Sequence, residues 1–94
     1  MSNSHYKSNV QEKYNENLFQ VASNIRKWRT LRGIKQEALA TILNISSVSL
    51  SKIETGKTNI PILRLFEIAI ALNIKVQMLF IDPCTIIEER QHNR

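Results

Sequence analysis

The sequence is poor in the residues that build disulfide-rich, zinc-binding or all-β domains. Its 94 residues include one cysteine, two glycines, two prolines, one tryptophan, two tyrosines and three phenylalanines. A single cysteine excludes an intrachain disulfide and a cysteine-based zinc site. The scarcity of glycine, proline and aromatic residues argues against a β-sandwich with many tight turns. We expect Cys84 to be a buried or half-buried side chain; an intersubunit bridge is the alternative.

Long apolar runs are also missing. The longest, residues 60–72, is broken by Arg64 and Glu67, so it cannot span a bilayer. The N-terminus has no apolar run of the kind that signal peptides carry. We therefore expect a protein of the cytoplasm.

Catalytic and metal-binding patterns are lacking as well. No histidine or aspartate is placed to activate a serine, and the sequence has no glycine-rich elbow. The two histidines, His5 and His92, lie in the terminal segments without cysteine or carboxylate clusters at ligand spacing. We expect no enzyme, no metal site and no cofactor.

Positive charge is what the sequence has in excess. The net charge is +5 and the pI about 9.7. Residues 17–32 carry Arg26, Lys27, Arg29 and Arg32 with no acidic residue among them. Such a segment suits a polyanionic partner, and we infer from charge that Arg26 and Lys27 contact DNA. The alternative is a solvated face that only keeps the protein soluble.

Apolar residues spaced at three and four predict an all-α chain with five helices. The first helix is expected to begin near residues 15–17, or earlier if the spacing of Val10, Tyr14 and Leu18 is helical, and to end at Gly33. The others are expected at about residues 36–43, 47–55, 61–72 and 76–80. We divide the chain into a polar arm or helical lead-in (1–15), a folded domain (16–81) and a tail (82–94).

Local chemistry predicts where several helices start and stop. Asn44 and Asn73 suit the left-handed positions after the second and fourth helices. Ser46 is expected to cap the third helix. The inward stripe of the second helix is expected to be Leu39, Ala40 and Leu43, and that of the fourth helix Ile62, Leu65, Phe66, Ala69 and Leu72.

The third helix has an unusual outer face. With Leu50 directed at the core, a spacing of about 100° per residue places Ser47, Val48 and Lys52 on the opposite side. A helix that served only as scaffold would usually carry stronger helix formers there. A poorly optimised solvent-exposed helix is the alternative to a binding surface.

The second and third helices together resemble the Cro/phage-repressor-like (XRE) helix-turn-helix family. The resemblance covers residues 24–80 and depends on segments QEALA (36–40), LNIS (43–46) and LSKIETGK (50–57). It implies a compact five-helix, lambda-repressor-like bundle whose third helix enters the DNA major groove. The turn has Asn44 where the family usually has glycine, which the left-handed tolerance of asparagine allows.

The resemblance also implies roles for individual residues. Three positions match residues that read base edges: Ser47, Val48 and Lys52. Five match residues that touch the sugar–phosphate backbone: Gln36, Ser46, Ser49, Thr55 and Lys57. Arg29 and Glu54 match a buried ion pair that ties helix 1 to the end of helix 3. A dimer surface is expected around Val76, Met78, Leu79 and Ile81.

Two functional hypotheses follow. The first is a sequence-specific transcriptional regulator, expected to be a repressor, that binds double-stranded DNA as a homodimer on a two-fold operator. The second is an antitoxin or protein-interaction module of the same fold, with Ile86 and Ile87 in the segment that binds a partner such as a toxin. A metabolite sensor is disfavoured because the five helices leave only short terminal segments.

Overall fold

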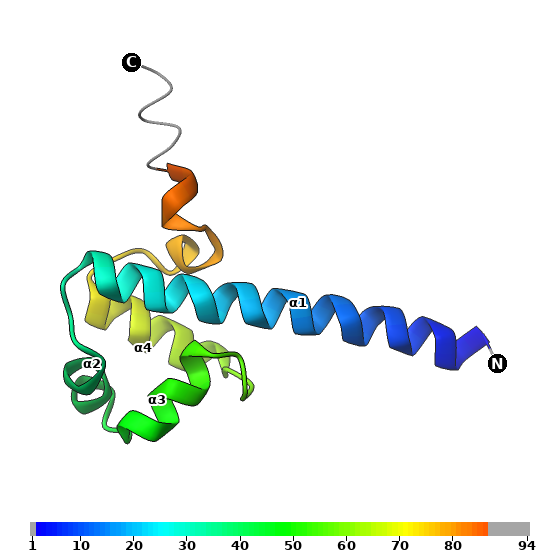
Figure 1. The fold of residues 1–94 in the computed structure, drawn as a ribbon, viewed down its shortest axis with the longest axis horizontal. Coiled ribbons are helices and arrows are strands. Elements are labelled where there is room, and N and C mark those ends of the chain that lie inside the picture. The colour runs from blue at the N-terminus through cyan, green and yellow to red at the C-terminus, as the bar shows by residue number, and fades with distance from the viewer. Residues whose placement is uncertain (1, 87–94) are drawn as a thin grey trace, which may run out of the picture.

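The computed structural model describes residues 2–86, with side chains from residue 9 onward. Four α-helices and one 3₁₀ helix make up the fold: α1 (Ser2–Leu31), α2 (Gln36–Leu43), α3 (Ser47–Glu54), α4 (Ile62–Leu72) and η1 (Val76–Phe80) (Figure 1). A helical turn begins at Pro83. Over the described residues there is no strand, which confirms the all-α prediction, and no helix is long and apolar enough to cross a bilayer.

The helix ends follow the local chemistry of the sequence. Gly33, Asn44 and Asn73 have φ angles of 71°, 58° and 56° and end α1, α2 and α4 in the left-handed conformation, as predicted. The backbone N–H groups of Asn44 and Asn73 each bond a carbonyl of the preceding helix, at 3.1 Å and 3.0 Å. The short loops after α1, α2 and α4 therefore fix the directions of the helices that follow them, α2, α3 and η1.

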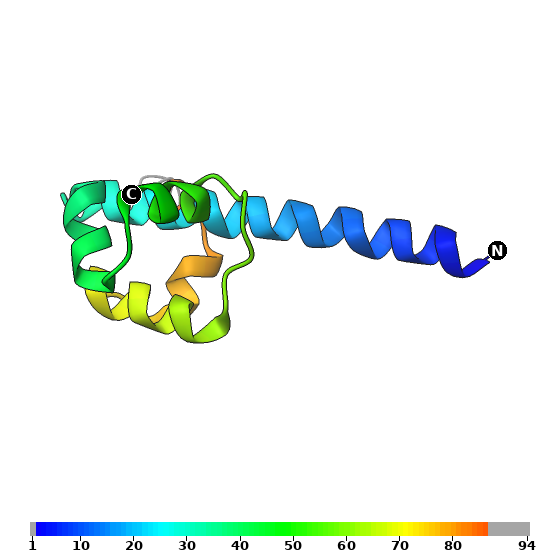
Figure 2. The same cartoon turned by 90° about the horizontal axis from the view of Figure 1, so that it is seen from below.

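One apolar core joins all five elements. Ile25 of α1 is fully buried, and its buried neighbours come from each of the other helices: Leu39, Ala40, Leu43, Leu50, Ile53, Ile68, Ala69, Leu72 and Leu79. α2 and α3 pack on each other at one end of the bundle, while η1 lies between α1 and α4 (Figure 2). The predicted inward stripe of α2 is confirmed.

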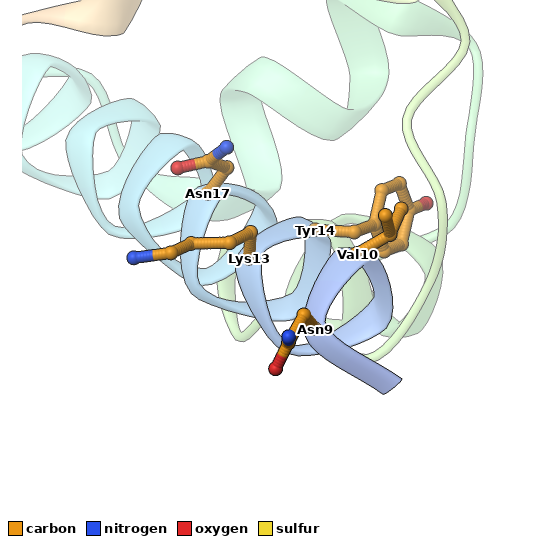
Figure 3. Close-up of a pocket in the computed structure, with 5 residues that line it drawn as sticks. All are labelled: Asn9, Val10, Lys13, Tyr14 and Asn17. Atoms are coloured by element: carbon orange, nitrogen blue, oxygen red, sulfur yellow. The ribbon is translucent and has the colours of Figure 1, made fainter. Parts of the chain in front are cut away.

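The first helix is longer than expected and extends beyond the bundle. It begins at Ser2, so the expected start near residues 15–17 is wrong. Of the two alternatives for residues 1–15, the helical lead-in agrees with the structure. The radius of gyration of 15.3 Å exceeds the ~12 Å of a compact chain of this length, as expected for a helix that projects (Figure 1). Val10 and Tyr14 lie side by side on α1 (Figure 3). The Tyr14 hydroxyl donates to the Asn59 side chain in the loop after α3.

The predicted inward stripe of α4 is confirmed in part: Ala69 and Leu72 are buried and Leu65 packs against the core. Ile62 and Phe66, expected inside, are exposed, whereas Ile68 is fully buried. The buried side of the helix consists of Ile68, Ala69 and Leu72. α4 is apolar around more than half of its circumference, so periodicity alone could not decide which arc faces inward.

The 3₁₀ helix packs on the core and removes Leu79 from the expected dimer surface. Leu79 is fully buried and is not available to a partner, whereas Val76 and Met78 are half-buried and Ile81 is exposed. The Asn24 amide donates to the Leu79 carbonyl at 3.0 Å, and the Trp28 indole N–H donates to the Met78 carbonyl at 2.8 Å. The side chain of Cys84, expected to be buried or half-buried, is exposed. Ile87 and His92, and the side chain of His5, lie outside the described residues.

Candidate nucleic-acid interface

The second and third helices form a helix-turn-helix unit. The turn between them is closed by the Ile45 N–H, which donates to the Ala40 carbonyl at 3.0 Å. Ala40 is buried where α2 meets α3, and its small side chain lets the two helices approach closely. Leu50 and Ile53 turn into the core below them. These contacts fix the orientation of α3 relative to the rest of the bundle.

Ser46 caps the third helix as predicted. Its hydroxyl oxygen accepts from the Ser49 N–H at 3.0 Å and its O–H donates to the Ser49 hydroxyl oxygen at 3.0 Å. The Ser46 hydroxyl is thus committed to the helix start. The Ser49 hydroxyl keeps its own hydrogen for another acceptor.

The outer face of α3 is open to solvent. Ser47, Val48 and Lys52 are all exposed, and 65% of the Val48 surface is accessible. No described element covers this side of α3 (Figure 1). Among residues 9–86, Lys52 makes no ion pair, so its charge is unneutralised at the surface. The three residues expected at base edges therefore share one accessible face.

A buried ion pair joins the first helix to the end of the third. The Arg29 guanidinium donates to the two Glu54 carboxylate oxygens at 2.7 Å and 3.1 Å. The side chains are only 12% and 1% exposed. The Gln36 side-chain amide donates to the same carboxylate at 3.1 Å, and Arg29 also donates to the Ile34 carbonyl at 2.8 Å. One carboxylate therefore holds α1, the start of α2 and the end of α3 together.

The side chains expected to contact the DNA backbone differ in whether their hydrogen-bond donors are already used within the protein. The Thr55 O–H donates to the Ser51 carbonyl at 2.7 Å, and one N–H of the Gln36 amide is engaged by Glu54. Lys57 is exposed. The first backbone N–H groups of α2 have no partner within the helix and carry the positive end of its dipole.

A groove of about 380 Å³ runs beside the exposed face of α3. It lies between that helix, the loop after it and the start of α4, and is lined by Ile45, Ser49, Lys52, Ile53, Thr58, Asn59, Pro61 and Arg64. Sequence reasoning missed Thr58, Asn59 and Arg64. The cluster of polar residues before Pro61 was the available signal, because a loop next to a binding helix shares its surface.

A family model decides the assignment of this unit. The model for helix-turn-helix proteins named HTH_3 matches residues 25–79, from the C-terminal part of α1 to η1. The chain belongs to the HTH_3 family. The match spans α2, the turn and α3, and it agrees with the XRE-type resemblance in the sequence. None of the curated proteins searched matches the chain.

Solved structures of other helix-turn-helix proteins share the fold. The restriction-modification controller protein C.AhdI from Aeromonas hydrophila is 26% identical with a TM-score of 0.65, over 68% of this chain and 97% of that one. An HTH_3 family transcriptional regulator from Vibrio cholerae is 27% identical with a TM-score of 0.65, over 70% of this chain and 37% of that one. The hypothetical transcription factor NHTF from Neisseria is 25% identical with a TM-score of 0.68, over 81% and 86%.

Lys27 of α1 is bonded away from the helix-turn-helix surface. The Lys27 ammonium donates to the Asp82 carboxylate at 2.8 Å, beside the turn that begins at Pro83. That turn and α3 lie on opposite sides of α1 (Figures 1 and 2). Lys27 therefore does not share the accessible face of α3, and DNA contacts by Lys27 and by the exposed Arg26 stay predictions. Its bond with Asp82 raises the pKa of Lys27 and lowers the pKa of Asp82.

Arg32 is also engaged within the protein. Its guanidinium donates to the Leu72 carbonyl at 3.0 Å, at the C-terminal end of α4. A cation there satisfies a carbonyl that the helix leaves open and meets the negative end of its dipole. Lys27, Arg29 and Arg32 are thus bonded within the protein. The exposed lysines at the helix-turn-helix are Lys35, Lys52 and Lys57.

Proposed function

We propose that this HTH_3 protein acts in the cytoplasm as a transcriptional regulator, a repressor that occupies a promoter as a homodimer on a two-fold operator. The observation that carries the proposal is the free outer face of α3, held rigidly by the core and by the Arg29–Glu54 pair. An α-helix with short side chains can enter the major groove of B-DNA without steric conflict. The three related structures, whose names describe a controller protein, a transcriptional regulator and a transcription factor, support the same role.

Base readout is assigned to three side chains of α3. Lys52 donates to O6 and N7 of a guanine. Val48 packs on the methyl group of a thymine, which its exposed isopropyl group suits. Ser47, in the first turn of α3, donates to or accepts from a base edge.

Backbone contacts are assigned around this face. The free N–H groups at the start of α2 and the remaining amide N–H of Gln36 point to one phosphate. Ser49 contributes its free hydroxyl hydrogen and Lys57 its charge. Ser46 and Thr55, whose hydroxyl hydrogens are bonded inside the protein, act by positioning the two ends of α3.

A dimer is part of the proposal because one module is small. A single domain of this kind covers only ~600–1,000 Å² on DNA, too little for high specificity. Two copies related by a two-fold axis would read half-sites about 10 base pairs apart, or a multiple of that distance. Selection of bound sites from random DNA should yield an inverted repeat and identify the operator.

The proposed readout is tested by comparing two lysines. On the selected operator, Lys52→Ala is expected to cost ~1–3 kcal/mol of binding free energy and to relax preference at one base pair per half-site. Lys57→Ala is the matched control, because a phosphate contact should weaken binding equally on all sequences and reduce the salt slope by about 1. Fluorescence anisotropy over a series of salt concentrations measures both effects.

The opposite result would reject the assignment. If affinity does not fall with salt, or if neither lysine variant changes it, α3 is not a DNA-binding surface. If Lys52→Ala behaves like Lys57→Ala, the protein binds DNA but Lys52 reads no base.

Two serines separate helix capping from DNA contact. Ser46→Ala removes the cap and is expected to lower the free energy of unfolding by ~1 kcal/mol. Ser49→Ala leaves the Ser46 cap bond to its backbone N–H intact, so stability should change by less than ~0.5 kcal/mol while operator affinity falls. Urea unfolding and anisotropy on the same samples give the two quantities. A Ser49→Ala protein with wild-type affinity would remove Ser49 from the interface.

A further inference from the structure

The fourth helix has a second apolar face that the bundle does not cover. Four large side chains on α4 are exposed to 68%, 73%, 45% and 77%: Ile62, Leu63, Phe66 and Ile70. Single exposed apolar residues are common on protein surfaces, but a contiguous patch of several is typical of an interaction site. We call these four residues the α4 stripe.

The spacing of the α4 stripe is that of a helix-packing seam. Leu63, Phe66 and Ile70 follow one another at three and four residues, the spacing at which side chains line one side of a helix. The core side of the same helix carries Ile68 and Leu72, which are fully buried or nearly so. α4 is thus built to pack on two sides, and the protein itself fills only one of them.

The position of the α4 stripe leaves the DNA-binding face free. The core side of α4 faces α1 and η1, and no described element lies beyond α4 on its other side (Figure 2). α3 lies beside α1 and apart from α4 (Figure 2). A partner on the α4 stripe would therefore stand beside the protein, not between α3 and its operator.

We infer that the α4 stripe is the surface on which a second copy of this chain docks. The inference rests on the proposed function, since a two-fold operator requires a surface that is complementary to itself. In an antiparallel pair of α4 helices, Leu63 of one copy lies opposite Ile70 of the other, with Phe66 next to the two-fold axis. The stripe is nearly symmetric about Phe66, so one face can meet its own copy without an unpaired charge.

The apolar side chains of the α4 stripe suit the centre of such an interface. A standard interface buries ~800 Å² per partner, with an apolar centre and a polar rim. The α4 stripe supplies the centre, and Arg64 and Glu67, paired at 3.2 Å on the same helix, supply part of the rim. The dimer surface first expected, around η1, retains fewer free apolar side chains because Leu79 is buried.

The test compares the same substitution on two exposed helix positions. The wild-type protein without DNA is expected to sediment as a dimer at micromolar concentration. Ile70→Glu should weaken association about tenfold or more, because it places a charge in the centre of the apolar contact. Ile42→Glu, on α2 and also exposed, is the matched control and should sediment as the wild type. Circular dichroism verifies folding, and Ile70→Ser replaces Ile70→Glu if the latter does not fold.

Cross-linking tests the arrangement of the pair. With Cys84→Ser as background, Phe66→Cys should form a disulfide-linked dimer on mild oxidation, whereas Ile42→Cys should not. Phe80→Glu examines the rival surface at η1, where Phe80 is 59% exposed. Dissociation by Phe80→Glu and not by Ile70→Glu would overturn the inference. A monomeric wild type, alone or bound to a different protein, would overturn it as well.

A duplex with a single half-site separates the two proposals. Monomeric Ile70→Glu should bind one half-site as tightly as the wild-type protein does, while losing the added affinity of the full operator. If the wild-type protein binds no DNA at all, the proposed function fails whatever the dimer does. If it binds DNA and Ile70→Glu remains dimeric, only the docking surface is wrong.

Discussion

Replacing Glu54 with alanine is expected to lower the free energy of unfolding by about 3–5 kcal/mol. The Arg29 guanidinium, 12% exposed, would keep its charge but lose both carboxylate oxygens that now accept from it at 2.7 Å and 3.1 Å. The Gln36 amide would lose its acceptor as well. Urea unfolding followed by circular dichroism measures the change, which should appear as a lower midpoint with an unchanged m-value.

A surface pair provides the control. Glu67→Ala removes the carboxylate that meets Arg64 at 3.2 Å, but Glu67 is largely exposed, so the change should stay below ~1 kcal/mol. The double variant Arg29→Met/Glu54→Leu should recover most of the loss, because no buried charge is left without a partner. If Glu54→Ala and Glu67→Ala lower the free energy of unfolding equally, burial does not determine how much the Arg29–Glu54 pair contributes to stability.

The Glu54 result also bears on the proposed function. Glu54 connects the start of α2, which is proposed to meet a phosphate, with the end of α3, which is proposed to read bases. Because the pair orients these elements and does not itself face solvent, DNA affinity should fall mainly as the folded fraction falls. Affinity corrected for that fraction should change little if the core alone can hold α3 in place.

Features fixed by local chemistry could be predicted from the sequence. The left-handed Asn44 and Asn73 and the Ser46 cap depend on a few neighbouring residues, so the sequence contains all the information they need. The helix-turn-helix unit was recognisable because its apolar and small positions occur together within about twenty residues. The Arg29–Glu54 pair came from the family resemblance, since nothing local connects residues 25 positions apart.

Features fixed by distant contacts could not be predicted. The partner of Lys27 lies 55 positions away and that of Arg32 lies 40 positions away. The charge pattern therefore indicated a DNA-binding segment where the structure has internal bonds. The full length of α1 was missed because its first residues are polar, and only the spacing of Val10, Tyr14 and Leu18 indicated that the helix could begin before residue 15. In α4, core and surface residues are equally apolar, so only the packed structure distinguishes them.

The second large loss of stability is expected from truncating Leu79, which is fully buried. Leu79→Ala is expected to lower the free energy of unfolding by about 2–5 kcal/mol, since it removes most of a fully buried side chain and leaves a cavity. The cost should lie toward the upper part of that range if η1 cannot move inward. Two hydrogen bonds from α1, to the carbonyls of Met78 and Leu79, hold its backbone in place and limit such a collapse.

The neighbouring residue makes this prediction specific. Phe80 follows Leu79 in the same 3₁₀ helix but is mostly exposed, so Phe80→Ala should change stability by no more than ~0.5 kcal/mol despite removing more atoms. Urea unfolding of both variants, with sedimentation of each, separates a core role from an interface role. A stable Leu79→Ala protein that has lost only its ability to dimerise would return η1 to the dimer surface. If Leu79→Ala is strongly destabilised but its folded fraction still dimerises, Leu79 belongs to the core and α4 remains the docking helix.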